Sequence, residues 1–277
     1  MVQYQPGVYL PSSAELPCSD DTPVDNEDQN FVPNFLLFLL EFLWADRLDW
    51  FFSVDMGIYH TTGVSPLVPI VPDGFLSLGV ERRKGGNSRS SYVLWEENGV
   101  PPIFALEMVS LTYGGEYDSK MDIYARLGVL YYVIYNPKFW QRDRHTPLEV
   151  YRLVNGEYEL QIGEPFFMPE IGLGIGRAIR RFGGVQREVL YWYDERGNRY
   201  LALEEAEQQA REQLVIERQQ RELLQQQADT ERRQRELLQQ QADAERRQRE
   251  LAQQQADEYA KLLEQYRQRF GELPAPE

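Results

Sequence analysis

The last quarter of the chain repeats itself every 14 residues, and this repeat limits what that part can form. The units 217–230, 231–244 and 245–258 share one pattern of Glu, Arg, Leu, Gln and Ala. Most of these residues are strong helix formers, and 14 residues make two heptads. The repeat therefore predicts a charged α-helical tail over residues 204–277.

The seam of this predicted helix is only half apolar. The seam consists of heptad positions a and d. If Leu224 is placed at position d, apolar d and a residues alternate along the helix with charged ones. The charged positions are Glu231, Arg235, Glu245 and Arg249. A weak coiled coil, formed with a second copy or a protein partner, and a solvated single helix therefore both stay open. The later stripe of Tyr259, Leu263, Tyr266 and Phe270 is better formed and could dock on another surface.

A packed core is available to the first 200 residues. The chain has 17 Tyr, 13 Phe and 5 Trp, and after Tyr200 only three aromatic residues remain. Aromatic side chains supply much of the apolar area that a core buries. We therefore predict one folded domain over residues 31–203, preceded by a polar, proline-containing extended arm over residues 1–30.

Composition argues against several classes of protein. The net charge is −15, whereas proteins that grip nucleic acid through its phosphates usually carry a basic surplus. The single cysteine, Cys18, fits a reducing compartment, which indicates a cytoplasmic protein with an inert thiol. We expect no signal peptide at the N-terminus, and the longest apolar run, residues 35–43, is too short to cross a bilayer.

The order of patterns predicts a mixed α/β sheet. A helix is expected over residues 34–46, capped by Asn30 or Asn34, and a second one over residues 116–127, stopped by Gly128. Strands are expected at 49–59, 75–80, 102–109, 129–135 and 189–193, with a hairpin of 147–154 and 157–162. Residues 171–176 contain three glycines without the context of a phosphate loop, which favours a close turn.

Three residues suggest chemistry. Asp73 follows Pro72 at a strand entrance, Glu107 interrupts an apolar strand, and Lys120 lies 13 residues further on in a helix. A buried acid must be paired, protonated or bound to a metal, and two converging acids offer oxygen ligands to Mg²⁺. The alternative is an ordinary core in which Glu107 and Lys120 form an ion pair and Asp73 caps a turn.

Three ordered segments resemble one family. Residues 71–78 (VPDGFLSL), 105–110 (ALEMVS) and 118–137 (DSKMDIYARLGVLYYVIYNP) look like the signature of the Uma2 family, whose members are bacterial restriction-endonuclease-like domains of the PD-(D/E)XK nuclease superfamily. The resemblance covers roughly residues 15–200. It implies a mixed sheet flanked by helices, and a Mg²⁺-dependent (or Mn²⁺-dependent) DNA endonuclease that leaves 5′-phosphate ends. A homodimer that cuts both strands is an expectation by analogy.

The resemblance also assigns roles to residues. It implies that Asp73 and Glu107 are metal ligands and that they act in catalysis with Lys120. The superfamily usually places its lysine two residues after the glutamate, where this chain has Val109; Lys120 on the following helix matches the position that the family uses. Additional candidates are Asp55, as a further acid, and Tyr124, one helical turn beyond Lys120, for which core packing is the ordinary role.

Other readings stay beside this one. The chain could be a non-catalytic interaction or assembly protein that uses a nuclease-like fold and its helical tail. We expect His60 and His145, the only histidines, to be ordinary surface residues. The one basic cluster of the predicted domain, Arg177, Arg180 and Arg181, either contacts phosphate or balances nearby acids.

Overall fold

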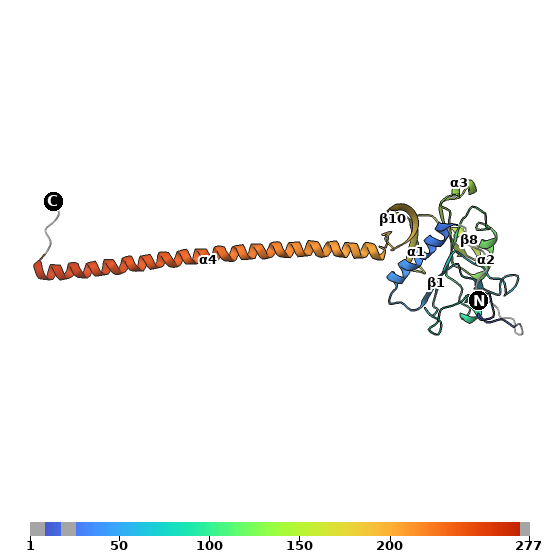
Figure 1. Cartoon of the computed structure of the whole chain (residues 1–277), viewed down its shortest axis with the longest axis horizontal. Helices are drawn as coiled ribbons and strands as arrows, with labels where there is room; N and C mark the ends of the chain where they lie inside the picture. Colours follow the sequence, from blue (N-terminus) through green and yellow to red (C-terminus); the bar gives the residue numbers. More distant parts are fainter. Residues whose placement is uncertain (1–8, 18–25, 272–277) are drawn as a thin grey trace. The chain divides into compact units, whose positions relative to one another are not determined.

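The fold is built around a six-stranded mixed sheet. The computed structural model describes residues 9–17 and 26–271. The strand order is β1-β3-β5-β6-β7-β8; β5 and β6 pair in parallel, and the other neighbours are antiparallel. Figure 1 labels the two edge strands, β1 and β8. The strands are β1 (Trp50–Val54), β3 (Gly74–Leu78), β5 (Phe104–Met108), β6 (Tyr131–Tyr135), β7 (Leu148–Val154) and β8 (Glu157–Leu160). This arrangement confirms the expected mixed α/β class.

Two smaller sheets and four α-helices make up the rest of the regular structure in residues 9–17 and 26–271. A second, antiparallel sheet has the order β11-β10-β9, and β2 pairs in parallel with β4. Their bounds are β2 (Ile58–Tyr59), β4 (Tyr92–Val93), β9 (Phe166–Met168), β10 (Leu173–Phe182) and β11 (Val185–Tyr193). The α-helices are α1 (Glu27–Leu43), α2 (Ser119–Leu127), α3 (Trp140–Asp143) and α4 (Leu203–Phe270), and Leu94–Glu96 form a 3₁₀ turn.

The first helix begins earlier than predicted. Asn26, and neither Asn30 nor Asn34, is the N-cap of α1, and its side chain accepts hydrogen bonds from the backbone N–H groups of Asp28 and Gln29. An Asn cap satisfies donors that the first turn leaves unpaired. The helix continues through Pro33, so the prediction of an extended arm over residues 1–30 is wrong for residues 27–30. The rest of that arm lies largely outside the described residues.

Each face of the large sheet carries its own core. On β5, Phe104, Leu106 and Met108 join a cluster with α1 and the second sheet, whereas Ala105 faces the cluster that contains α2. Side chains alternate between the two faces along a strand. Glu107 therefore points to the α2 side, and this alternation decides which helix can meet its carboxylate.

The glycine-rich stretch after residue 170 is a strand, so the prediction of a close turn is wrong for most of it. Gly172 has a φ of +80° and forms the turn, but Gly174 and Gly176 lie within β10. A Cβ atom on Gly176 would come 2.9 Å from Cβ of Pro165, which leaves no room for a side chain. By contrast, the hairpin at Asn155-Gly156 is confirmed, because both residues have positive φ, as type I′ turns require.

The tail is one continuous helix. The contacts divide the chain into two units, residues 1–206 and 207–277. The start of α4 belongs to the first unit: Ala202, the residue before the helix, is buried, and Glu205 in its first turn accepts hydrogen bonds from Arg199. Beyond Ala206 the side chains of α4 are exposed through Arg269. Among the described residues, no helix is long and apolar enough to cross a membrane.

Candidate active site at one edge of the sheet

The register of three strands brings the predicted acidic residues to one edge of the large sheet. Gly74, the first residue of β3, pairs with Val54 at the end of β1 and with Leu106 near the end of β5. Each of these three residues has an acid as a direct chain neighbour: Asp73, Asp55 and Glu107, respectively. Acids that are far apart in the sequence therefore meet where β1 and β5 end and β3 begins.

Glu107 is buried, and both of its carboxylate oxygens are hydrogen bonded. Its exposed fraction is 1%. The ammonium of Lys120 donates to Oε2 at 2.7 Å, and the hydroxyl of Tyr124 donates to Oε1 at 2.6 Å. Lys120 and Tyr124 are four residues apart on α2, so they lie on one face of that helix. The helix thus meets the buried acid with one charged and one neutral donor.

The start of α2 is fixed by a glycine turn. Gly115 has a φ of +81°, a left-handed conformation that favours glycine, and its carbonyl accepts the backbone N–H of Lys120 at 3.0 Å. The Asp118 side chain caps the helix by accepting the N–H of Ser119, and Gly128 ends it in the left-handed conformation. These local signals place Lys120 in the first turn, directed at β5.

Asp73 is anchored beside Glu107. Its Oδ2 accepts the backbone N–H of Met108 at 2.6 Å. Burial, and after it the charge of Glu107, raises the pKa of Asp73 well above its usual value. Burial also raises the pKa of Glu107, although the Lys120 ammonium opposes this rise. The two carboxyl groups therefore lie close enough to act on each other electrostatically.

Lys120 stays positively charged. Burial alone would lower the pKa of its ammonium, but the charge and hydrogen bond of Glu107 outweigh burial, and the net pKa is raised. The Lys120 ammonium is thus one positive charge beside two carboxyl groups. The group of Asp73, Glu107 and Lys120 therefore carries an excess negative charge when both acids are ionised. Such a group favours the binding of a further cation.

The two remaining site candidates differ in their surroundings. Asp55 follows β1 with a φ of +48°, is exposed, and its charge contributes to the raised pKa of Asp73. Tyr124 is fully buried, with its ring 5.0 Å from that of Tyr132. It fills the core as expected and also donates to Glu107, a polar contact that the pattern of apolar residues could not indicate.

The donor set suits a magnesium ion. Mg²⁺ is commonly bound by one or two carboxylates, with waters and substrate phosphate oxygens as its other ligands. Asp73 and Glu107 supply two carboxylates, and a cation beside them would lower the raised pKa of both. Within residues 9–17 and 26–271, no group of three or more His, Cys, Asp or Glu residues is arranged to hold a metal. Asp73 and Glu107 are the two residues of this group that would hold such an ion.

The part of the chain that contains these residues matches one known family. A family model named Uma2, described as "Putative restriction endonuclease", matches residues 21–174. This is more than half of the chain. The chain belongs to the Uma2 family. No curated protein and no solved structure is significantly similar to it. The Uma2 match contains Asp55, Asp73, Glu107, Lys120 and Tyr124, and it ends at the beginning of β10.

One further acid near the candidate site was missed by sequence reasoning. Glu116 is buried, and its carboxylate accepts the backbone N–H of Gly114 at 3.0 Å. Its charge contributes to the raised pKa of both Glu107 and Lys120. The predicted helix over residues 116–127 put this acid on a helix, whereas it precedes α2 and closes the loop before it. The two glycines ahead of Glu116 were the available signal.

The histidines differ from the expectation of surface residues. His60 is buried with 3% of its surface exposed, its Nδ1 lies 2.9 Å from Thr62 Oγ1, and burial lowers its pKa. His145 is half-buried, lies 3.2 Å from Glu149 and stacks on Tyr117. Both side chains are thus held by neighbours within the Uma2 fold.

The single cysteine, Cys18, lies outside the described residues.

The predicted basic cluster turns out to be mostly neutralised. Arg177 pairs with Glu164 at 2.9 Å, and Arg180 pairs with Glu204 at 3.1 Å. Arg181 donates to the backbone carbonyl of Gly184 at 2.9 Å. Of the two alternatives, balancing of nearby acids accounts for Arg177 and Arg180.

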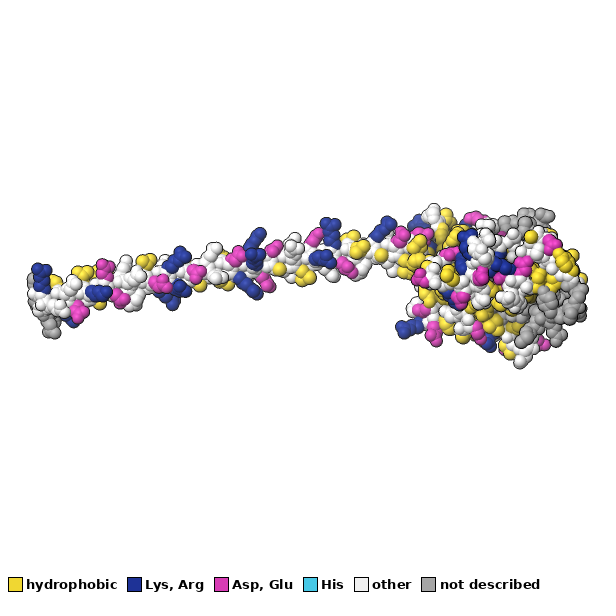
Figure 2. Space-filling model, turned by 90° about the horizontal axis from the view of Figure 1, so that it is seen from below, with side chains coloured by type: hydrophobic (Ala, Val, Ile, Leu, Met, Phe, Trp, Pro, Cys, Tyr) yellow, Lys and Arg dark blue, Asp and Glu magenta, His cyan; other side chains and the backbone are white. Residues whose placement is uncertain are grey.

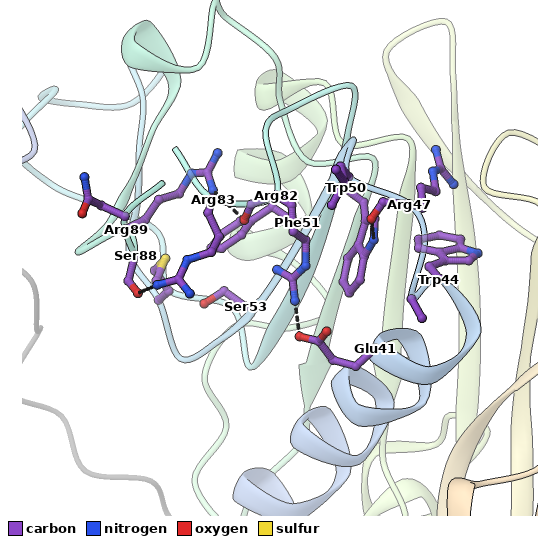
Figure 3. Close-up of a pocket in the computed structure, with 14 residues that line it drawn as sticks. Glu41, Trp44, Arg47, Trp50, Phe51, Ser53, Arg82, Arg83, Ser88 and Arg89 are labelled. Carbon is purple, nitrogen blue, oxygen red and sulfur yellow. Dashed lines mark hydrogen bonds and ion pairs between the residues drawn. The ribbon is translucent and has the colours of Figure 1, made fainter. Parts of the chain in front are cut away.

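A cavity of about 520 Å³ lies along β1, on the edge strand of the large sheet (Figure 3). Arg82 lies 3.9 Å above the ring of Trp50 on its wall. Three of its arginines pair with carboxylates: Arg47 with Asp49, Arg82 with Glu41 and Arg89 with Glu97. Their charge is therefore balanced. Asp73, Glu107 and Lys120 do not line this cavity, so it is separate from the proposed site of the Uma2 domain.

Proposed function

We propose that this chain is a metal-dependent DNA endonuclease that hydrolyses phosphodiester bonds. The observation that carries the proposal is the grouping of Asp73, Glu107 and Lys120 at one sheet edge of a Uma2 domain. Asp73 and Glu107 are the residues that would hold Mg²⁺ or Mn²⁺. When bound, the ion would make a coordinated water more acidic and offset the charge that builds up on the phosphate.

The protein's own residues divide the remaining work. The Tyr124 hydroxyl fixes one oxygen of Glu107, which sets the orientation of that carboxylate. Lys120 has a raised pKa, so at neutral pH it is a cation that contacts the phosphate or orients water and not a base that removes a proton. The backbone N–H of Met108 holds Asp73 facing the same region.

The test is cleavage of supercoiled plasmid with Mg²⁺ or Mn²⁺. We expect nicking by the wild type and its loss in Glu107→Ala and Lys120→Ala. The matched control is Lys84→Ala, because Lys84 also pairs with acids but lies elsewhere, 3.0 Å from Glu96. Equal nicking by all four proteins would indicate a contaminating nuclease. Absence of nicking by the wild type over a range of salts and substrates would contradict catalysis.

Metal binding has a readout that does not depend on activity. We expect Mg²⁺ to raise the thermal unfolding midpoint of the wild type, because a ligand that binds only the folded state stabilises it. The same addition should leave Asp73→Asn and Glu107→Gln nearly unchanged. A wild type that fails both assays would favour the alternative function, a non-catalytic assembly protein.

The long exposed helix is the observation that favours this alternative. Residues 1–206 contain the sheet and its cores, so a variant that ends at Ala206 keeps Glu204 and Glu205 with their arginine partners. If this variant binds Mg²⁺ and nicks DNA, α4 is dispensable for chemistry. If only the full chain acts, the tail takes part in function.

A further inference from the structure

The long helix α4 carries a seam of regularly spaced apolar residues that are exposed to solvent. Leu214, Leu224 and Leu238 each expose 65% of their surface, and Tyr259 exposes 69%. Figure 2 shows hydrophobic side chains at the surface along α4 among interspersed basic and acidic ones. A helix that is solvated on all sides gains nothing from apolar residues at fixed intervals, so their spacing indicates a second helix.

Charged residues alternate with the apolar ones along the same seam. At heptad positions d and a, Leu224 and Ala228 are followed by Glu231 and Arg235. The 14-residue repeat continues this order with Leu238, Ala242, Glu245 and Arg249. The seam therefore consists of apolar layers and Glu/Arg layers in turn.

The seam charges are held more loosely than the charges beside the seam. The closest atoms of Glu231 and Arg235 are 3.9 Å apart, and the same distance separates Glu245 and Arg249. In contrast, the pairs beside the seam, such as Arg232 with Glu236, are 3.1 Å apart and hydrogen bonded. The seam residues thus keep more of their bonding capacity for a partner.

We propose that α4 pairs with α4 of a second copy of this chain in an antiparallel coiled coil, with Glu231 opposite Arg235 of the second copy. A parallel pair in register would place Glu231 against Glu231 and Arg235 against Arg235, and like charges at a seam oppose association. Antiparallel helices place position d opposite position a, so each Glu faces an Arg.

One register matches every layer from residue 210 to residue 256. Leu224 then faces Ala242, Ala228 faces Leu238, Arg221 faces Glu245, Glu217 faces Arg249, Leu214 faces Ala252 and Ala210 faces Ala256. A shift by one 14-residue unit along the partner would instead put Glu217 opposite Leu263 and Arg221 opposite Tyr259. A shift by one unit the other way keeps matching layers only over residues 210–242 and puts Glu207 opposite Glu245. The pattern therefore favours the longer register as well as the antiparallel orientation.

Flanking arginines do not reverse this preference. Arg232 lies next to the seam and approaches its own copy in the proposed pair. It is bonded to Glu236 on its own helix at 3.1 Å, and Arg246 is bonded to Glu250 in the same way. Their charges are already offset at the surface, where ion pairs contribute little in either direction.

Charge exchange in the full chain tests the pairing, with the dimer dissociation constant measured by analytical ultracentrifugation. Glu231→Arg places arginine opposite arginine in two layers, and we expect dimerisation to weaken by about tenfold or more, which corresponds to about 1.4 kcal/mol. The double variant Glu231→Arg/Arg235→Glu again places an arginine opposite a glutamate. Its dissociation constant should return to within about threefold of the wild-type value. Glu212→Arg makes the same charge change at heptad position f, on the face opposite the seam; it is the matched control and should change little.

Disulfide trapping tests the orientation independently. In a Cys18→Ser background, a mixture of Ala228→Cys and Leu238→Cys chains should form a crosslinked dimer on mild oxidation, whereas Ala228→Cys alone should not. Crosslinking of Ala228→Cys with itself would show parallel pairing and overturn the proposal. A wild type that stays monomeric at all concentrations would overturn it as well. Neither result bears on the nuclease assay.

Discussion

The ammonium of Lys120 lies 2.7 Å from a carboxylate oxygen of Glu107, and only the lysine reaches solvent, with 27% of its side chain exposed against 1% for the glutamate. The pair is thus open on one side and closed on the other. Such a pair can release its lysine toward a bound substrate while the acid stays in place. A purely structural ion pair would have the same geometry, and measurements of stability and of metal binding on matched variants distinguish the two roles.

Substitution of Lys120 should show how much the buried carboxylate of Glu107 destabilises the fold when its cation is removed. We expect Lys120→Met to lower the free energy of unfolding by about 2–4 kcal/mol in EDTA, because it leaves Glu107 charged in the core without its cation. The double variant Lys120→Met/Glu107→Gln should recover part of this loss. Urea denaturation measures both. Lys84→Met is the control, since Glu97 keeps Arg89 at 2.9 Å; an equal loss in the control would contradict the special cost at Glu107.

Neutralising Asp73 should stabilise the protein. The pKa of this acid is raised in the folded state, so the folded protein binds its proton more readily than the unfolded chain. The ionised group therefore destabilises the fold above the folded-state pKa, and this penalty fades as the pH falls through that pKa toward the usual value of the acid.

We accordingly expect Asp73→Asn to be more stable than the wild type at pH 7 without metal, by about 1 kcal/mol or more, with the gap closing as the pH is lowered. Thermal unfolding from pH 4 to pH 8 measures this gap. The Asn side chain can still accept the N–H of Met108. A gap that widens toward low pH would contradict the assigned direction of the pKa shift.

The Tyr124 hydroxyl should matter more than that of a neighbouring tyrosine. Tyr124→Phe removes the hydrogen bond to the Glu107 carboxylate, and bonds to charged groups contribute about 1.5–3 kcal/mol. Tyr132→Phe is the control, because its hydroxyl donates to the neutral backbone carbonyl of Glu116 at 2.7 Å in the same core. We expect the larger loss of stability, and the loss of Mg²⁺ stabilisation, in Tyr124→Phe. Equal behaviour of the two variants would assign Tyr124 to packing alone.

The position of the Lys120 side chain should depend on the glycine turn that precedes α2. Gly115→Ala introduces a Cβ atom at a φ of +81° that falls on the Ser119 hydroxyl at the start of α2. We expect a loss of about 1–3 kcal/mol and a weaker Mg²⁺ response, since the turn that places Lys120 must shift. Gly86→Ala has nearly the same φ, +82°, with open space around it. Gly86→Ala should lose only the stability that the strained backbone conformation costs. A similar loss of stability in both variants would rule out steric displacement by the new Cβ atom as the cause.

The local patterns of the sequence predicted the site's strands well. The apolar run with a single acid correctly located β5, and Gly128 correctly marked the end of α2, because both signals depend on a few adjacent residues. The pairing of β3 with β5, which brings Asp73 to Glu107, rests on contacts across more than 30 residues. Local propensity does not determine such pairing, and the family resemblance supplied the expectation.

The errors have physical causes in tertiary packing. The first helix was predicted to begin at residue 34, but the Asn26 cap and burial of the apolar face start α1 at Glu27 and carry it through Pro33. The glycines of β10 suggested a turn, although Gly176 is a strand residue because Pro165 occupies the space of its side chain. His60 was expected at the surface, and its burial depends on the loops that pack around it.

The 14-residue repeat of α4 has a consequence for how this chain can change over generations. Duplication or deletion of one unit would lengthen or shorten the helix by about 21 Å. It would return every residue to the same heptad position, because 14 is a whole number of heptads. The order of leucine, alanine, glutamate and arginine would continue across the junction. The number of units can therefore change without altering the heptad pattern of α4. The catalytic candidates in the folded domain keep their places.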